Sequence, residues 1–286
     1  MLSTGLMGQE KVWESVHRHL EIRKLTLMGG YGKRGEREPV GEVDLEMGDI
    51  VSIVGPTGSG KTELINDIER FAKGNTPSKR RILVNGTEAS EDFISEPSKN
   101  PVALITQHTN FLSDFPVRKF LEMHAKVRRG EATDSIVDDT LNFANELTGE
   151  PIIPDSAMTE LSGGQTRALL IADAVVIGSS PIILLDEIEN AGIDRTRALE
   201  LLKQYEKIFI FVTHDPRIAL LSDLRIVMKN GAMQKKVLRG HSERRAMEEI
   251  EKIDELVSDF RMRIRNGDEL DEDYMIGRLR ALGYIA

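Results

Sequence analysis

The chain contains 286 residues, of which 40% are hydrophobic and 30% are charged. This composition is ordinary for a soluble globular protein and excludes disordered, collagen-like and disulfide-scaffold classes. The formal net charge of −9 argues against attraction of the whole surface to nucleic acid or anionic lipid, although a local basic patch would not show in the sum. The absence of cysteine excludes disulfides, thiolate nucleophiles and cysteine-ligated metals, and it fits a reducing compartment.

The beginning of the chain and its apolar runs bear on its location. Residues 1–19 are predicted to form an N-terminal leader, and residues 1–11 lack the basic start and apolar core of a secretory signal. The longest apolar run, residues 168–178, is interrupted by Asp173 and is shorter than the about 20 residues that a membrane-spanning helix needs. We therefore expect a cytoplasmic protein without a membrane span of its own.

Apolar runs typical of strands alternate with helical stretches along the chain. Strands are predicted at residues 20–27, 42–47, 50–54, 81–84, 102–106, 182–185 and 207–212, followed by a hairpin of residues 225–228 and 233–237 around Asn230-Gly231. Helices are predicted at residues 62–73, 117–129, 134–147 and 165–176. This alternation is typical of a parallel α/β sheet, here with a helical insert near residues 110–170.

A glycine-rich loop follows the strand predicted at residues 50–54. Its residues are Gly55, Pro56, Thr57, Gly58, Ser59, Gly60, Lys61 and Thr62, which fit the pattern G-x-x-x-x-G-K-[ST]. The glycines allow backbone N–H groups to point at the β- and γ-phosphates of a nucleotide, Lys61 adds a positive charge, and Thr62 offers a hydroxyl to Mg²⁺. The alternative is a chance glycine-rich turn, which would need neither the preceding strand nor the following helix. We therefore expect nucleotide binding.

A second motif indicates which class of nucleotide-binding protein this is. The segment Leu161-Ser162-Gly163-Gly164-Gln165 resembles the signature motif of the ATP-binding cassette (ABC) family. Further positions match that family in chain order: Gln107 stands where its Q-loop glutamine belongs, Asp186 and Glu187 resemble its Walker B aspartate and catalytic glutamate, and His214 resembles its switch histidine.

The resemblance covers about residues 20–240 and implies a fold and an activity. The implied fold is an α/β P-loop NTPase with an ABC-type antiparallel β subdomain and an inserted helical subdomain at about residues 110–170. The implied activity is hydrolysis of ATP to ADP and phosphate. Tyr31 precedes the P-loop at about the place of the family's adenine-stacking aromatic residue, or it is simply a surface aromatic residue.

The same resemblance assigns roles to the candidate site residues. Glu187 would polarise the attacking water as a general base, and His214 would hold the γ-phosphate. Gln107 would contact Mg²⁺ or the water. The residues expected to hold Mg²⁺, directly or through water, are Thr62, Gln107 and Asp186. The residues expected to act in catalysis are Glu187, His214, Gln107 and Lys61.

The signature motif also implies partners. In the ABC family the helix start at Ser162, Gly163 and Gly164, followed by Gln165, meets the γ-phosphate bound to a second subunit. We therefore expect two chains, identical or related, to sandwich two ATP molecules head to tail, with hydrolysis opening the sandwich.

The helical insert bears on what the ATPase drives. Residues 108–121 are similar to the stretch where transporter ATPases meet their membrane subunits, although any compact ABC ATPase has such a subdomain. The favoured hypothesis is the cytoplasmic ATPase of a membrane transporter. The alternative is a soluble ABC ATPase that acts on another protein, as in metalloenzyme or cofactor maturation, or on nucleic acid.

Three departures from the family pattern lie where its subunits communicate, and they motivate the alternative. Ile188 stands where most transporter ATPases have a proline. The D-loop is one residue longer than usual if Asp194 is its aspartate, and Asp173 stands where an arginine is usual. We therefore expect an atypical D-loop.

The C-terminal segment, residues 241–286, lies outside the resemblance. It carries a short heptad-like stripe formed by Ile250, Ile253, Val257, Phe260 and Ile264. A break at Asn266-Gly267 precedes a second helix predicted at residues 270–282. The resulting hairpin would dock on a partner or second subunit, or it would pack on its own ATPase domain. The second reading is favoured because two heptads are too few for a stable free coiled coil.

Overall fold

We describe the protein from a computed structural model, which covers residues 22–95, 100–106, 109–111, 113–130, 133–178, 180–187 and 195–285. The predicted leader, Gln107, Ile188 and the predicted D-loop at residues 189–194 lie outside these ranges.

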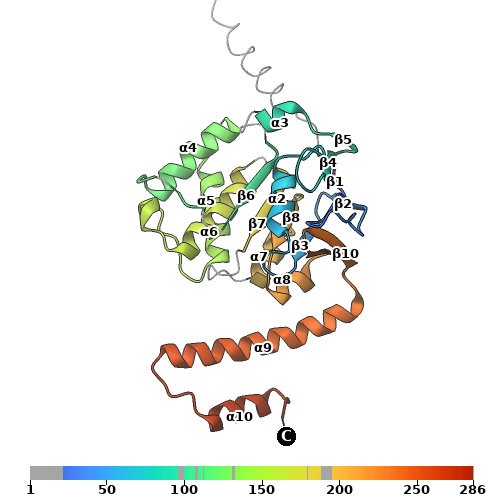
Figure 1. The fold of residues 1–286 in the computed structure, drawn as a ribbon. Helices are drawn as coiled ribbons and strands as arrows, with labels where there is room; N and C mark the ends of the chain where they lie inside the picture. Colours follow the sequence, from blue (N-terminus) through green and yellow to red (C-terminus); the bar gives the residue numbers. More distant parts are fainter. Residues whose placement is uncertain are drawn as a thin grey trace, which may run out of the picture.

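Two sheets form the framework of the fold (Figure 1). The smaller sheet has the strand order β2-β1-β4-β5 and is antiparallel throughout. The larger sheet has the order β10-β9-β3-β8-β7-β6, in which the strands from β9 to β6 are parallel and β10 pairs antiparallel with β9. The strands are β1 (Lys24–Met28), β2 (Glu42–Glu46), β3 (Ile50–Val54), β4 (Arg81–Val84), β5 (Thr87–Glu88), β6 (Val102–Ile105), β7 (Ile182–Asp186), β8 (Ile208–Val212), β9 (Leu224–Lys229) and β10 (Ala232–Leu238). The expected parallel sheet, closing hairpin and antiparallel subdomain are therefore confirmed.

Glycine turns direct the chain between these strands. The chain leaves the smaller sheet after β2 and enters the larger one at β3 through Gly48, whose φ is +94°. Asn85 and Gly86 both have positive φ, +50° and +82°, as a tight two-residue hairpin turn requires, and they join β4 to β5.

The helices lie mostly where the sequence predicts them. They are α2 (Lys61–Glu69), α3 (Glu91–Ser95), α4 (Val117–Arg129), α5 (Asp134–Leu147), η2 (Met158–Glu160), α6 (Gly163–Ala172), η3 (Asp173–Ile177), α7 (Arg195–Leu202), α8 (Pro216–Leu221), α9 (His241–Arg265) and α10 (Glu272–Ala281). Several predicted limits were wrong: β1 begins at Lys24 rather than residue 20, α6 ends at Ala172 and is followed by η3, and α10 spans Glu272–Ala281 rather than residues 270–282. Helix α2 ends before residue 73 because the fully buried Phe71 takes a left-handed conformation and packs against Phe93. Helix α6 starts before residue 165 because Ser162 caps it.

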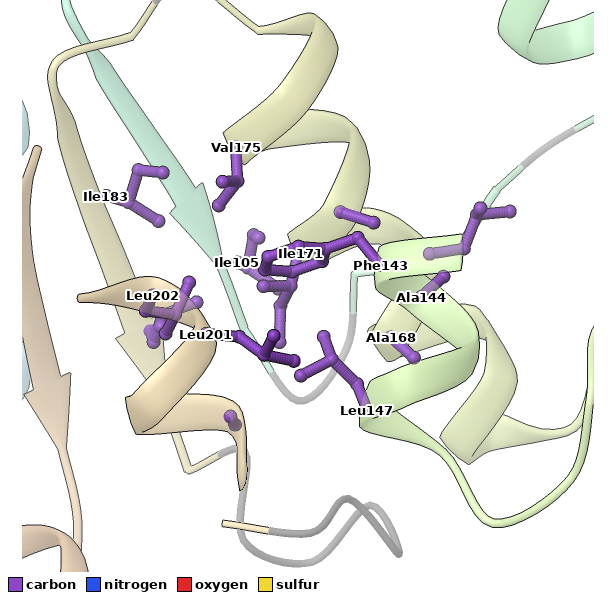
Figure 2. Close-up of a cluster of buried hydrophobic side chains, with 14 of the residues drawn as sticks. Ile105, Phe143, Ala144, Leu147, Ala168, Ile171, Val175, Ile183, Leu201 and Leu202 are labelled. Carbon is purple, nitrogen blue, oxygen red and sulfur yellow. The ribbon is translucent and has the colours of Figure 1, made fainter. Parts of the chain in front are cut away.

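The helical insert is fixed to the larger sheet by a continuous apolar core (Figure 2). Phe143 and Leu147 of α5 meet Ile171 of α6, and Leu202 of α7 lies against the same cluster. Ile105 of β6 belongs to it too, and all of these side chains are buried. The core therefore holds the helix that follows the signature motif at a defined position beside the sheet.

Helix α9 of the C-terminal hairpin packs on its own domain, but not mainly through the predicted stripe, whereas α10 packs on α9. Helix α9 contacts α8, and its buried apolar residues are Met247 and Leu256. Ile253, Val257 and Ile264 of the stripe are exposed, whereas Phe260 faces α10 through Tyr274. The stripe failed as a guide because α9 meets two short helices, α8 and α10, at different parts of its length instead of one long partner helix. None of the helices in the described ranges combines the length and apolar composition that crossing a bilayer requires.

Candidate functional site

The carboxyl ends of β3, β8, β7 and β6, four of the parallel strands, meet at one edge of the larger sheet. Asp186 at the end of β7 lies opposite Val212 at the end of β8, and Ile53 of β3 lies opposite the same valine. A cleft of about 460 Å³ opens at this edge and is lined by residues 57–63 together with Lys33, Thr106, Asp186, Glu187, Val212 and His214. Ligands of open α/β sheets bind in this position, beyond the carboxyl ends of the strands.

The glycine-rich loop between β3 and α2 forms the floor of the cleft. Gly58 and Gly60 have φ of +76° and +99°, conformations that favour glycine. A Cβ atom on Gly60 would lie 2.7 Å from Cα of Gly231, and one on Gly55 would lie 2.4 Å from the carbonyl oxygen of Met228. The loop leads directly into α2, whose first N–H groups have no partner within the helix. This cradle suits an anion such as a nucleotide phosphate.

Lys61 brings a positive charge over the loop. Its Nζ donates to the carbonyl oxygens of Gly55 at 2.8 Å and Pro56 at 3.4 Å, and it lies 3.3 Å from Nε2 of His214. Phosphate oxygens could replace these acceptors without moving the lysine out of the cleft.

Glu187 and His214 face each other across the cleft. The Oε1 atom of Glu187 lies 3.6 Å from Nε2 of His214, and the backbone N–H of Glu187 donates to the carbonyl oxygen of Val212 at 3.0 Å. Glu187 has a φ of +51°, a conformation that costs energy in a non-glycine residue and is frequent at functional sites. A carboxylate and an imidazole so arranged can accept and return the proton of a water molecule.

The cleft also has the donors that Mg²⁺ prefers. The Thr62 hydroxyl and the Asp186 carboxylate belong to residues of its lining, and both are hard oxygen ligands. Among the residues that the structure describes, no three or more His, Asp or Glu side chains cluster as a metal site. Mg²⁺ commonly binds through one or two protein ligands plus phosphate oxygens and water, so these residues fit an ion held together with a nucleotide. Gln107, the third predicted ligand, is not among the described residues.

The loop that carries Tyr31 brings a different side chain into the cleft. Tyr31 is exposed, with Nζ of Lys79 5.6 Å from its ring centroid, and it is not part of the cleft lining. Lys33 does line the cleft. Its Nζ donates to the carbonyl oxygen of Gly58 at 2.8 Å, and its backbone N–H donates to the carbonyl oxygen of Asn230 at the same distance. Lys33 was not predicted as a site residue. A lysine two positions after Tyr31 in a glycine-rich loop was the pattern that could have indicated it.

The signature motif lies outside the cleft of its own chain. Ser162 caps α6: its hydroxyl accepts from the N–H of Gln165 at 3.3 Å, and the Gln165 side chain accepts from the N–H of Ser162 at 2.9 Å. Neither these residues nor Gly163 and Gly164 line the cleft. One chain therefore brings the P-loop, Asp186, Glu187 and His214 together and leaves the signature residues apart.

A buried ionic network braces the cleft from behind. The fully buried Arg80 donates to Glu38 Oε1 at 2.6 Å, to Asp67 Oδ2 at 2.9 Å and to the carbonyl oxygen of Gly231 at 2.6 Å. Burial lowers the pKa of Arg80, but the hydrogen bonds and charges of Glu38 and Asp67 outweigh it and raise the pKa above its ordinary value. Because the N–H of Gly231 donates to the carbonyl oxygen of Ser59 at 2.7 Å, the network supports the P-loop. Nothing in the local sequence pattern singled out Arg80.

Known proteins resemble this chain in sequence and in fold. A family model described as ABC transporter matches residues 41–190. An uncharacterized ABC transporter ATP-binding protein of Methanocaldococcus jannaschii is 49% identical over 254 residues, which make up 89% of this chain and 97% of that protein.

Solved structures extend the likeness to the fold. The chain resembles cbiO1 of Clostridium perfringens, part of an ABC transporter complex, with a TM-score of 0.58 and 21% identity over 79% of this chain and 93% of that one. It also resembles an ATP-binding cassette solved as a dimer in a post-hydrolysis state with ADP and Pi, with a TM-score of 0.55 and 22% identity over 76% of this chain and 99% of that one.

Proposed function

Because the chain belongs to the ABC transporter family, and is an ATPase as that family's ATP-binding cassettes are, we propose that it drives a membrane transporter whose membrane-spanning part is another chain. The observation that carries this proposal is the cleft in which the P-loop, Lys61, Glu187 and His214 meet. The relative of similar length in Methanocaldococcus jannaschii, described as an ABC transporter ATP-binding protein, supports it.

The proposed roles of the residues follow from their places in the cleft. The N–H groups of the P-loop and the ammonium group of Lys61 bind the phosphates of ATP, and Lys33 adds a second positive charge. Glu187 accepts a proton from the attacking water, and His214 holds the γ-phosphate. Thr62 and Asp186 hold Mg²⁺, which when bound neutralises charge developing on the phosphate oxygens.

We propose further that the site is completed by a second subunit. The helix start at Ser162 has the N–H groups and dipole to bind a γ-phosphate, but it lies outside the cleft of its own chain. Two chains arranged head to tail would bring each signature motif to the other chain's nucleotide. Loss of the γ-phosphate would then remove a contact that holds the dimer closed. Hydrolysis would therefore let the two subunits move apart as rigid bodies.

The helical insert offers a surface for a membrane subunit. Phe115, Met123, Val127 and Ile153 are exposed apolar residues of this insert, and Val127 is 79% exposed. Met123 and Val127 are four residues apart on α4 and therefore share one face of that helix, and exposed apolar residues on one face suit an interaction surface. Phe115 also falls within residues 108–121, the stretch expected to meet a transporter partner.

The decisive experiment is to isolate the chain with its bound proteins from the membrane and soluble fractions of its native cells. We expect a protein with several membrane spans to accompany it from the membrane fraction. Recovery with a soluble enzyme alone would overturn the transport proposal and favour the alternative of conformational work on another protein. Stimulation of ATP hydrolysis by the recovered partner would distinguish a working complex from a contaminant.

A further inference from the structure

The C-terminal helix α9 is connected to the turn that carries His214. The guanidinium of Arg217, in α8, lies between two carboxylates. Its Nε and second terminal nitrogen donate to Asp215 at 3.3 and 3.2 Å, and the other terminal nitrogen donates to Asp254 of α9 at 2.5 Å. Asp215 is the residue directly after His214, so one arginine joins the tail to the candidate site.

The turn around His214 is held on both sides. Oδ1 of Asp215 accepts from the backbone N–H of Arg217 at 2.7 Å and caps α8. The N–H of Asp215 donates to the hydroxyl of Thr213 at 2.9 Å, and the N–H of Thr213 donates to Ile53 of β3 at 3.3 Å. The Asp215 carboxylate therefore ties the backbone directly after His214 to the start of α8.

Burial strengthens the ion pair between Arg217 and Asp215. The side chains of Asp215 and Arg217 are 8% and 13% exposed, whereas that of Asp254 is 40% exposed. Water screens the inner pair only weakly, and Asp254 occupies the side of the guanidinium that faces α9. The carboxylate of Asp254 therefore helps to orient the plane of the guanidinium, which in turn positions Asp215.

We propose that Arg217 is a positioning residue for hydrolysis, and that Asp254 of the C-terminal tail sets its orientation. Through Asp215, the pair holds His214 in line with Lys61 and Glu187. The tail is thus part of the machinery that aligns the switch histidine, in addition to packing on the domain. This inference rests on the role proposed above for His214.

The same helix provides a matched control. Glu243 of α9 accepts a hydrogen bond from Arg225 of β9 at 2.6 Å, and this ion pair also anchors the tail. Arg225 contacts the carbonyl oxygen of Ala219, and neither residue is part of the cleft lining. Glu243→Gln therefore removes the charge of an anchor of α9 and leaves the side chains of Asp215, Arg217 and Asp254 unchanged.

The experiment compares steady-state ATP hydrolysis, nucleotide affinity and thermal unfolding of the full chain and its Asp254→Asn, Asp254→Glu and Glu243→Gln variants. We expect Asp254→Asn to lower kcat roughly two- to fivefold, the range that loss of a partly exposed ion pair supports, with KM for ATP unchanged. Glu243→Gln should keep the wild-type kcat, and Asp254→Glu should recover most of it.

Two results would overturn the inference: an unchanged kcat in Asp254→Asn, or an equal loss in Glu243→Gln, which would mean that general docking of α9 is what matters. Failure of the wild-type chain to hydrolyse ATP in any assembly would instead overturn the proposed function. A fall in Tm for Asp254→Asn that exceeds the fall for Glu243→Gln, without a change in kcat, would show a purely structural link.

Discussion

The Nζ atom of Lys61 lies 3.3 Å from Nε2 of His214, although 153 positions separate the two residues in the chain. An ammonium group can only donate a hydrogen bond, so the direction of this contact is set by the tautomer of His214. The same Nε2 lies 3.6 Å from Oε1 of Glu187. A phosphate that entered the cleft would draw Lys61 to itself and free His214 to contact the phosphate.

The charge of Lys61 should dominate nucleotide affinity. In Lys61→Ala we expect ATP affinity to fall roughly 10- to 100-fold, since a hydrogen bond to a charged group contributes about 1.5–3 kcal/mol. Titration with a fluorescent ATP analogue measures this. Lys235→Ala removes an exposed lysine of β10 and serves as the control. Equal ATP affinities in wild type and Lys61→Ala would contradict the assignment of this loop as a P-loop.

Removal of the proposed general base should separate binding from hydrolysis. Glu187→Gln keeps the size of the side chain but cannot accept the proton of water, so we expect ATP binding with little turnover and accumulation of a dimer. Size-exclusion chromatography at saturating ATP detects the dimer, and wild type with ADP is the control. A monomer under these conditions would contradict the proposed sandwich.

A bulky, positively charged side chain at position 162 should disrupt the contact between subunits and leave the nucleotide site of its own chain intact. Ser162→Arg is expected to abolish hydrolysis and to leave nucleotide binding to the monomer largely intact, because Ser162 does not line its own cleft. The substitution also removes a helix cap, a loss that costs about 1 kcal/mol. Thr133→Ala removes the comparable cap of α5 and should keep activity. Loss of monomer binding in Ser162→Arg would count against the role of the motif across the dimer.

The buried arginine behind the P-loop should matter for stability far more than its exposed neighbour. Arg80→Met leaves the buried carboxylates of Glu38 and Asp67 without their cation, and we expect a loss of about 3–5 kcal/mol in the free energy of unfolding. Arg81 pairs with Glu88 at the surface, so Arg81→Met should cost less than about 1 kcal/mol. Urea denaturation of both variants makes the comparison, and similar losses would refute it.

Lys207 should make stability depend on pH. Burial, assisted by the charge of Arg129, lowers the pKa of Lys207 from its ordinary 10.5 to about 8. Between these values the unfolded chain binds more protons than the folded one. The free energy of unfolding therefore rises with pH across this window, by on the order of 1–3 kcal/mol.

The Lys207→Met variant isolates this effect from other titrating groups. The difference in unfolding free energy between wild type and variant should change by that amount between pH about 7.5 and about 10.5, as measured by chemical denaturation. A difference that stays constant across the window would show that the lysine keeps its ordinary pKa, held protonated by the carbonyl oxygens of Ala174, Gly178 and Ser180 to which it donates.

Interactions between residues close together in the sequence determined which helices and strands form and their order along the chain. The limits of α4 and α5 were predicted correctly, since Gly130 ends α4 in a left-handed conformation and Thr133 caps α5. The P-loop was recognisable because its glycines, lysine and threonine are consecutive. Caps, turns and periodicity depend on residues within a few positions of each other, and a sequence displays such relationships directly.

Only the tertiary structure decided which distant groups meet. It brought Lys33 rather than Tyr31 to the cleft and enclosed Arg80 between carboxylates from two other segments. It also packed α9 through Met247 and Leu256 instead of the predicted stripe, with Asp254 on Arg217. These contacts follow from how sheets and helices stack, and stacking is governed by the shape and burial of whole surfaces, which spacing along one chain does not encode.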